Sequence, residues 1–206
     1  MRNNENGRSM VEMLGVLAII GVLSAGGLAG YSKAMFKHKL NSTMDQITML
    51  VTNIRTMYGT QGNYGGLSEE AAYNLGIIPE VMVKTKTPAS GLVTEITLSN
   101  PFKGGVTIDT SKTKATAAND TAFVVTYSGL PKEACLALAT ADFGSGAGSG
   151  FIGVNVAASA DTAVYAGTGS GENGRAEGEA YSMSDALDAA ACGAAGENHT
   201  VSWKFY

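Results

Sequence analysis

The chain has 206 residues, of which 14 are basic and 18 acidic, and its formal net charge is −4. Only 16% of the residues are charged, below the usual share of about 25%, which argues against a disordered tail and against a basic nucleic-acid-binding protein. With 45% apolar residues the chain can build one sizeable core, and its 27 glycines predict a fold rich in turns.

Catalytic and metal sites are not indicated. The two histidines, His38 and His199, and the two cysteines, Cys135 and Cys192, are too few and too widely spaced for a zinc pattern, so we expect no metal and no cofactor. A Ser-His-Asp set would need His38, which falls on the predicted N-terminal helix, or His199, which we expect in an exposed loop. We therefore expect that the protein is not an enzyme.

The N-terminal region is the most informative part of the chain. Twenty uncharged residues, MLGVLAIIGVLSAGGLAGYS, separate Glu12 from Lys33 and are long enough to cross a hydrocarbon layer of about 30 Å. A cleaved secretory signal is the alternative, with its peptidase site within residues 24–30. Two features argue against it: residues 1–7 carry one Arg and one Glu and so have no net positive charge, and a carboxylate, Glu12, lies within the apolar run.

Helical periodicity also continues beyond the point where a signal peptide would be cut. Apolar residues recur at steps of three and four on one stripe, namely Phe36, Leu40, Met44, Ile47, Val51, Ile54 and Tyr58. The pattern predicts one helix over residues 8–58, roughly 75 Å long at about 1.5 Å per residue. Its first part, residues 8–32, is apolar all round, and its second part, residues 33–58, is amphipathic.

The segment Gly7-Arg8-Ser9-Met10-Val11-Glu12 resembles the processing site of type IV pilins. The resemblance implies that residues 1–7 are a leader, that a prepilin peptidase cuts after Gly7 and N-methylates Arg8, and that Glu12 is the fifth residue of the mature chain. The family usually has an apolar residue at the first mature position, so Arg8 departs from the pattern.

Glu12 is a candidate assembly residue. In a staggered helix bundle it can meet the N-terminal ammonium of a neighbouring copy in a low-dielectric setting. The alternative is a pair within one helix, because Arg8 precedes Glu12 by four residues.

Small residues in the same helix predict close helix packing. Gly26 and Gly30 form a GxxxG motif, and Gly21, Ala25 and Ala29 lie at four-residue spacing. The alternative is that Gly and Ala are simply common in membrane helices. We also expect the Gly26-Gly27 pair to be the place where the helix bends or unwinds in an assembled fibre.

Residues 59–206 are predicted to form an α+β head, in which an antiparallel sheet is laid against the amphipathic half of the helix. A loop is expected over residues 59–66, then a short helix opened by Ser68 and closed by Gly76 and Pro79. Further helices are expected over residues 131–140 and over residues 184–192 with Ser184 as N-cap. Strands are expected over residues 92–98, 106–109, 122–127, 151–156 and 201–206, the last alternating core-facing aromatics with Ser202 and Lys204.

Several short segments of the head resemble the type IVb, bundle-forming branch of the pilins (the bundlins). They are Asn100-Pro101-Phe102, Gly104-Gly105, residues 121–123, residues 132–135 with 138–140, and Gly153-Val154-Asn155. A head outside the cytoplasmic membrane lies in an oxidising space, so we expect a disulfide between Cys135 and Cys192, with two free thiols as the alternative.

The leading hypothesis is a structural subunit, the major pilin of a fibre for adhesion, aggregation or motility. The resemblance implies a precursor in the inner membrane, extraction by an assembly platform and ATPase, and a helical homopolymer on the cell surface, with no nucleic-acid partner. The alternatives are a minor pilin or a secretion pseudopilin and, from a different class, a secreted binding or enzymatic domain behind an ordinary signal peptide.

Overall fold

The computed structural model describes residues 10–113, 118, 120–144, 150–157, 180–188, 191–193 and 198–206. The chain divides into two compact units, Met1–Asn41 and Ser42–Tyr206. The first helix, α1 (Met10–Tyr58), supplies all that is described of the first unit and the opening segment of the second. By length and composition α1 is the one described helix that could cross a membrane. The predicted helix is confirmed from Met10 onward, while residues 8 and 9 and the leader, residues 1–7, lie outside the described residues.

Within the second unit, the remaining part of α1 buries one stripe of side chains. Ile47, Leu50 and Ile54 are fully buried, and Thr43, Val51 and Tyr58 lie beside them. The amide of Asn53 donates a hydrogen bond of 3.0 Å to the carbonyl oxygen of Ile77. The predicted apolar stripe is therefore the face that packs on the head.

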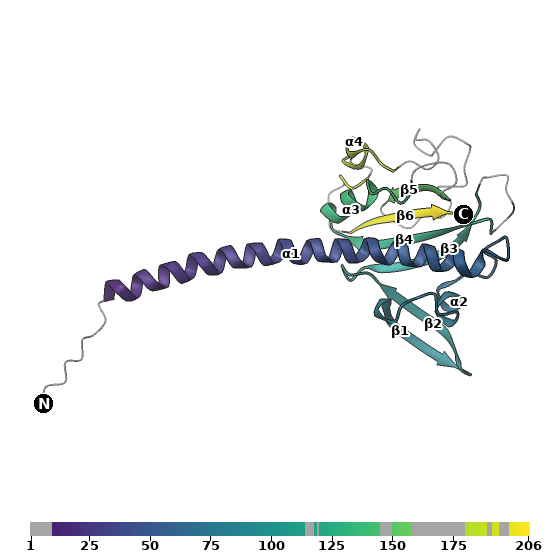
Figure 1. Cartoon of the computed structure of the whole chain (residues 1–206), viewed down its shortest axis with the longest axis horizontal. Coiled ribbons are helices and arrows are strands. Elements are labelled where there is room, and N and C mark those ends of the chain that lie inside the picture. The colour runs from purple at the N-terminus through teal and green to yellow at the C-terminus, as the bar shows by residue number, and fades with distance from the viewer. Residues whose placement is uncertain are drawn as a thin grey trace, which may run out of the picture. The chain divides into compact units, whose positions relative to one another are not determined.

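The head is a six-stranded antiparallel sheet in the order β1-β2-β3-β4-β6-β5 (Figure 1). Its strands are β1 (Val83–Ala89), β2 (Leu92–Ser99), β3 (Gly105–Ser111), β4 (Ala122–Leu130), β5 (Phe151–Ala157) and β6 (His199–Phe205). The predicted α+β class is confirmed. Five strands were expected, and β1 was missed because Val-Lys-Thr-Lys-Thr-Pro-Ala is almost wholly exposed and has no apolar alternation.

The central strands are covered on both faces. Phe123 of β4 and Phe205 of β6 stack with their ring centroids 5.6 Å apart, on the same face as Tyr64. On the opposite face, Thr126 and Ser202 share a buried hydrogen bond of 2.9 Å. The predicted alternation in the last strand is confirmed, since Trp203 and Phe205 are buried on one face, and the structure adds that Ser202 and Lys204 on the other face are buried as well.

The short helices follow local capping chemistry. The hydroxyl of Ser68 caps α2 (Glu69–Asn74) by accepting from the Ala71 N–H, as expected. The helix α3 (Lys132–Ala139) begins after Pro131, and a 3₁₀ turn, η1 (Glu80–Met82), leads into β1. The helix predicted over residues 184–192 was wrong in its extent: α4 (Met183–Ala186) has Ser182 as its N-cap and ends at Ala186.

One gap in the sheet is closed by a side chain. The strands β2 and β3 pair at two positions only, Leu98 with Val106 and Ser99 with Gly105. Beyond them the carboxylate of Glu69 accepts a 3.1 Å hydrogen bond from the Ile108 N–H. Glu69 thus replaces a lost strand partner for Ile108 of β3, since buried N–H groups need an acceptor.

Candidate assembly surface

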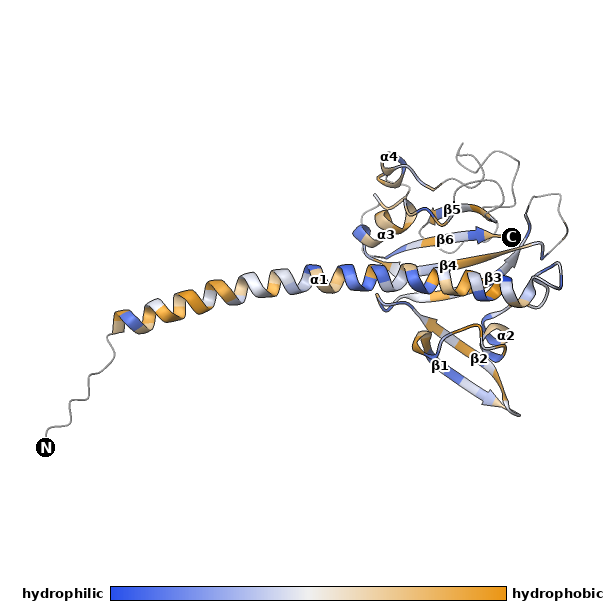
Figure 2. Ribbon diagram, viewed as in Figure 1, coloured by the Kyte–Doolittle hydropathy of each residue, from blue (hydrophilic) through white to orange (hydrophobic). Residues whose placement is uncertain are grey.

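The part of α1 in the first unit carries its large apolar side chains in the open. From Met10 to Tyr31 their exposed fractions run from 49% to 84%. Figure 2 colours much of this segment orange, for hydrophobic residues. They are Met10, Val11, Met13, Leu14, Val16, Leu17, Ile19, Ile20, Val22, Leu23, Leu28 and Tyr31. A soluble monomer seldom exposes so large an apolar surface, so this segment needs lipid or other protein around it.

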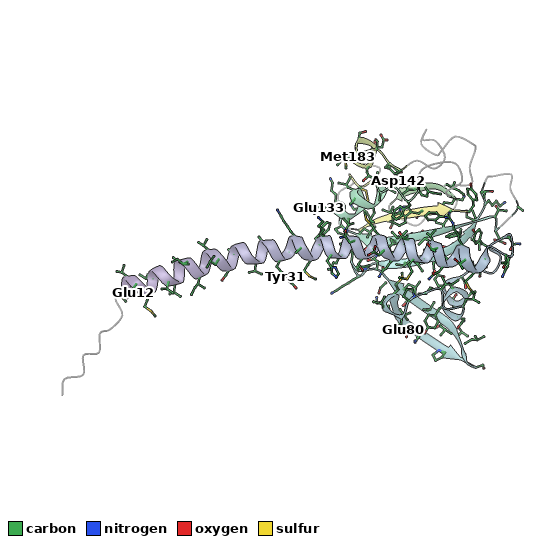
Figure 3. The ribbon with its side chains drawn as sticks, viewed as in Figure 1. Glu12, Tyr31, Glu80, Glu133, Asp142 and Met183 are labelled. Atoms are coloured by element: carbon green, nitrogen blue, oxygen red, sulfur yellow. A yellow bond between two sulfur atoms is a disulfide. The ribbon has the colours of Figure 1, made fainter. Side chains whose placement is uncertain are left out.

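Glu12 lies in the first turn of α1 and is exposed (Figure 3). A carboxylate is favoured there by the partial positive charge at a helix N-terminus, but in an apolar surrounding it still needs a cation. Its two candidate partners, the ammonium created by cleavage after Gly7 and the side chain of Arg8, lie outside the described residues.

The predicted helix-packing residues all lie on regular helix. Beyond its own stretch of helix backbone, an added Cβ at Gly21, Gly26 or Gly30 would meet no atom of the described residues within 4 Å. Contacts among the described residues of the chain therefore give no reason for glycine at these positions. Close approach of another helix remains our interpretation of Gly21, Ala25, Gly26, Ala29 and Gly30.

The predicted disulfide is present. Cys135 and Cys192 are 57 positions apart, both fully buried, and joined by an S–S bond of 2.03 Å. Cys135 lies on α3, and Cys192 lies in a turn whose N–H donates to the Ala186 carbonyl oxygen at 3.1 Å. The bond therefore fastens the segment around α4 to α3.

His199 is the one candidate catalytic residue of the head, and its expected position was wrong. It opens β6, is only 5% exposed and lies opposite Leu130 of β4. Among the described residues, no three or more His, Cys, Asp or Glu side chains gather where they could hold a metal ion.

The segment Asn100-Pro101-Phe102 is a structural joint. The amide nitrogen of Asn100 donates to the Ser128 carbonyl oxygen at 2.8 Å, and its amide oxygen accepts from the N–H groups of Phe102 and Gly104 at 2.9 and 3.1 Å. One buried side chain thus shapes the turn between β2 and β3 and ties it to β4.

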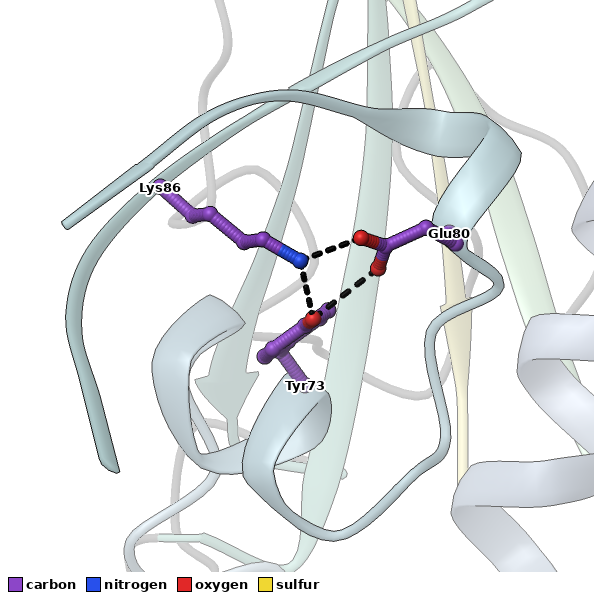
Figure 4. A network of polar contacts seen from close by, with 3 residues as sticks. All are labelled: Tyr73, Glu80 and Lys86. Atoms are coloured by element: carbon purple, nitrogen blue, oxygen red, sulfur yellow. Dashed lines mark hydrogen bonds and ion pairs between the residues drawn. The ribbon is translucent and has the colours of Figure 1, made fainter. Parts of the chain in front are cut away.

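An exposed polar triad missed by sequence reasoning joins α2, η1 and β1. The ammonium of Lys86 forms an ion pair with Glu80 and donates to the Tyr73 hydroxyl at 2.7 Å, and that hydroxyl donates to Glu80 Oε2 at 2.9 Å (Figure 4). These residues come from three separate short elements, and the fold of the segment from α2 to β1 brings them together. Because the triad is exposed, it holds the hairpin locally and forms no enclosed site.

Comparison with known proteins decides the family. The bundlin family profile matches residues 33–206. The chain belongs to the bundlin family. Two relatives, each described as the major structural subunit of bundle-forming pilus, come from Escherichia coli O127:H6 (strain E2348/69 / EPEC) and Escherichia coli O111:H-. Each is 30% identical over 154 residues, which cover 74% of this chain and 72% of the relative.

Among solved structures, this bundlin is similar to a type IVb pilin from Salmonella typhi. The TM-score is 0.49 at 16% identity, covering 79% of this chain and 97% of the other. The profile match begins at Lys33, after the apolar run. The roles of Glu12 and of the small residues therefore rest on their own chemistry.

Proposed function

We propose that this bundlin is the major structural subunit of a surface pilus, a helical homopolymer built through the N-terminal part of α1. The observation that carries the proposal is the exposed apolar surface from Met10 to Tyr31, on a chain whose relatives at 30% identity are major pilus subunits. A structural role also fits a chain for which the sequence offers no catalytic constellation.

The first step of the proposed pathway takes place in the inner membrane, where residues 8–32 hold the precursor. A prepilin peptidase cuts after Gly7 and methylates the new N-terminus at Arg8. An assembly platform and its ATPase then move the subunit from lipid into the fibre. Removal from lipid costs little if other copies replace the lipid around the same side chains, because both surroundings are apolar.

The second step sets the register of an incoming copy against a copy already in the fibre. Glu12 of an incoming copy pairs with the N-terminal ammonium of a copy already in the fibre, at low dielectric, where an uncompensated carboxylate is strongly disfavoured. In a helical polymer this contact is heterologous: each copy offers its acid to one neighbour and its amine to another, so the contact repeats along the fibre. Arg8 of the same helix competes for Glu12, but a basic residue four positions before an acidic residue forms a weaker pair than the reverse order.

The test is the intact mass of the subunit that dominates fibres sheared from the cell surface. We expect a chain that begins at Arg8, carries one N-terminal methyl group and has lost two hydrogens to the disulfide. A chain beginning at Tyr31 would contradict the proposal. Presence in sheared fibres as a trace component only would favour a minor pilin or pseudopilin instead.

A further inference from the structure

A short basic run follows the apolar segment of α1. Within seven positions the sequence holds Lys33, Lys37, His38 and Lys39. Lys33 and Lys37 are exposed and lie four positions apart, so they share one face of the helix. Like charges at this spacing destabilise a helix, so the two lysines are kept at a cost in helix stability.

Acidic residues of α1 lie too far along the helix to balance these lysines. Between Glu12 and Asp45 the sequence holds no aspartate and no glutamate. Asp45 follows Lys37 by eight positions, whereas ion pairs on a helix form between residues three or four positions apart. A helix face meant for water normally interleaves the two signs of charge. The counter-charge for Lys33 and Lys37 is therefore expected from outside the helix.

The position of the two lysines along α1 matches the surface of a bilayer. The 20 uncharged residues 13–32 are about 30 Å long as a helix, which is the thickness of a hydrocarbon layer. With that segment in lipid, Lys33 lies at the edge of the hydrocarbon, and Lys37 lies about 6 Å further out, among the headgroups. Tyr31, 64% exposed, lies at the same boundary, where aromatic side chains with a polar end are favoured (Figure 3).

The lysines also lie on the side of the membrane where basic residues are usually few. In the proposed precursor the head is outside the inner membrane, and residues 33–39 are at the outer surface with it. Basic residues are favoured at the cytoplasmic end of a membrane helix, yet residues 1–12 hold two arginines and residues 33–39 hold three lysines. Orientation in the membrane therefore does not account for these lysines.

We propose that Lys33 and Lys37 bind the headgroup phosphates of anionic phospholipids in the leaflet nearest the head, and so fix the depth at which the precursor is held. This inference rests on the proposed function. Lipid headgroups are the partner because they are anionic, lie at the depth of both lysines and surround the helix. A lysine side chain reaches them while its methylene groups stay beside apolar surface. Each lysine near an anionic membrane surface strengthens binding about fivefold.

The lipid preference of the full-length precursor, purified in a neutral detergent, tests the proposal. Native mass spectrometry with equal amounts of phosphatidylglycerol and phosphatidylethanolamine measures the ratio of the two bound lipids. We expect the wild type to prefer phosphatidylglycerol, and Lys33→Gln/Lys37→Gln to lower that preference about tenfold or more, at about fivefold for each lysine. Lys33→Arg/Lys37→Arg keeps both charges and should keep the preference. Lys84→Gln/Lys132→Gln, at exposed lysines of β1 and α3, is the matched control and should also keep it.

Three results would overturn the proposal. One is equal binding of the two lipids by the wild type, and another is a loss of preference in Lys84→Gln/Lys132→Gln as large as that in Lys33→Gln/Lys37→Gln. The third is displacement of phosphatidylglycerol by inorganic phosphate in millimolar amounts, which would show that the lysines recognise free phosphate and not a lipid surface. We expect no displacement.

A photocross-link in the membrane identifies the partner directly. Benzoylphenylalanine replaces Ala34, an exposed residue beside Lys33, and is activated in membranes that hold the precursor. We expect phospholipid as the main cross-linked product, and a single acidic protein as the main product would overturn the proposal. If sheared fibres lack the chain, the proposed function fails. If fibres contain the chain but the precursor shows no preference for the anionic lipid, the lipid inference alone fails.

Discussion

At the scale of single residues, Glu12 carries the most specific role. Glu12→Val removes the carboxylate and lowers the cost of membrane insertion, so an insertion defect cannot explain a loss of fibres. We expect normal insertion and cleavage and a sharp fall in fibre incorporation, measured as the ratio of sheared to membrane-held subunit. Glu133→Val, at an exposed acid of α3, is the control. Wild-type incorporation of the Glu12 variant would refute the pairing.

Glu69 makes the stability of the head depend on pH. Burial raises the pKa of Glu69 above its ordinary value, and burial does the same to the pKa of Asp109 nearby. A raised folded-state pKa contributes stability below the unfolded pKa, about 4.3 for Glu, and that contribution is lost as the pH rises through the folded pKa.

We therefore expect the contribution of Glu69 to the free energy of unfolding to be lost as the pH rises above the unfolded pKa of about 4.3, so that the wild type loses more stability with rising pH than Glu69→Gln. The glutamine oxygen can still accept the hydrogen bond from Ile108. Denaturant unfolding of the detergent-solubilised full chain measures this, with Glu133→Gln as control. Equal pH dependence in the wild type and Glu69→Gln would contradict the role of Glu69.

Gly104 has no room for a side chain. An added Cβ would lie 1.7 Å from the Ser128 carbonyl oxygen, a backbone atom that cannot turn away, whereas at Gly105 it would lie 3.1 Å from the movable Ser128 hydroxyl. Gly104→Ala should lower the free energy of unfolding by about 1–3 kcal/mol or more, and Gly105→Ala by less. Denaturant titration of the two variants measures both losses of unfolding free energy, and a larger loss in Gly105→Ala would contradict the prediction.

At the scale of elements, the disulfide stabilises the region around α3 and α4. Closing a loop with a sequence separation of 57 removes unfolded-state entropy worth about 4 kcal/mol in the chain-entropy model. The double variant Cys135→Ser/Cys192→Ser, which leaves no free thiol, should lose much of that amount. It should also become sensitive to periplasmic proteases. Unchanged protease resistance would count against the bond as a stabiliser.

Elements with strong periodicity were predictable from sequence, and elements defined by their neighbours were not. The stripe through Ile47 and Ile54 identified the helix, and short runs rich in Val and Phe identified five strands. The strand β1 escaped because edge strands with Lys and Pro lack an apolar alternation. The burial of His199 escaped because it follows from β6 lying between β4 and β5, which no local pattern records.

The candidate functional residues also divide into those that the sequence predicted and those that it did not. Glu12 and the two cysteines stand out in the sequence because a lone acid in an apolar run and a spaced cysteine pair each carry a physical meaning. The triad of Tyr73, Glu80 and Lys86 requires the fold, since its residues come from separate elements.

At the scale of the whole molecule, the two units meet different physical demands. Residues 10–32 form an apolar helix that no described part of the chain buries. The Ser42–Tyr206 unit has its own closed core of aromatic and branched side chains and one disulfide. A folded head attached to an apolar helix that the described chain does not bury suits a subunit whose helix becomes buried when copies of the chain assemble.

A reconstruction of the purified fibre at side-chain resolution tests this account most directly. The account predicts that the Glu12 carboxylate of each copy lies about 3 Å from the N-terminal nitrogen of an adjoining copy, as a charge-assisted hydrogen bond requires. A fibre in which Glu12 lies far from every amine of the adjoining copies would contradict it.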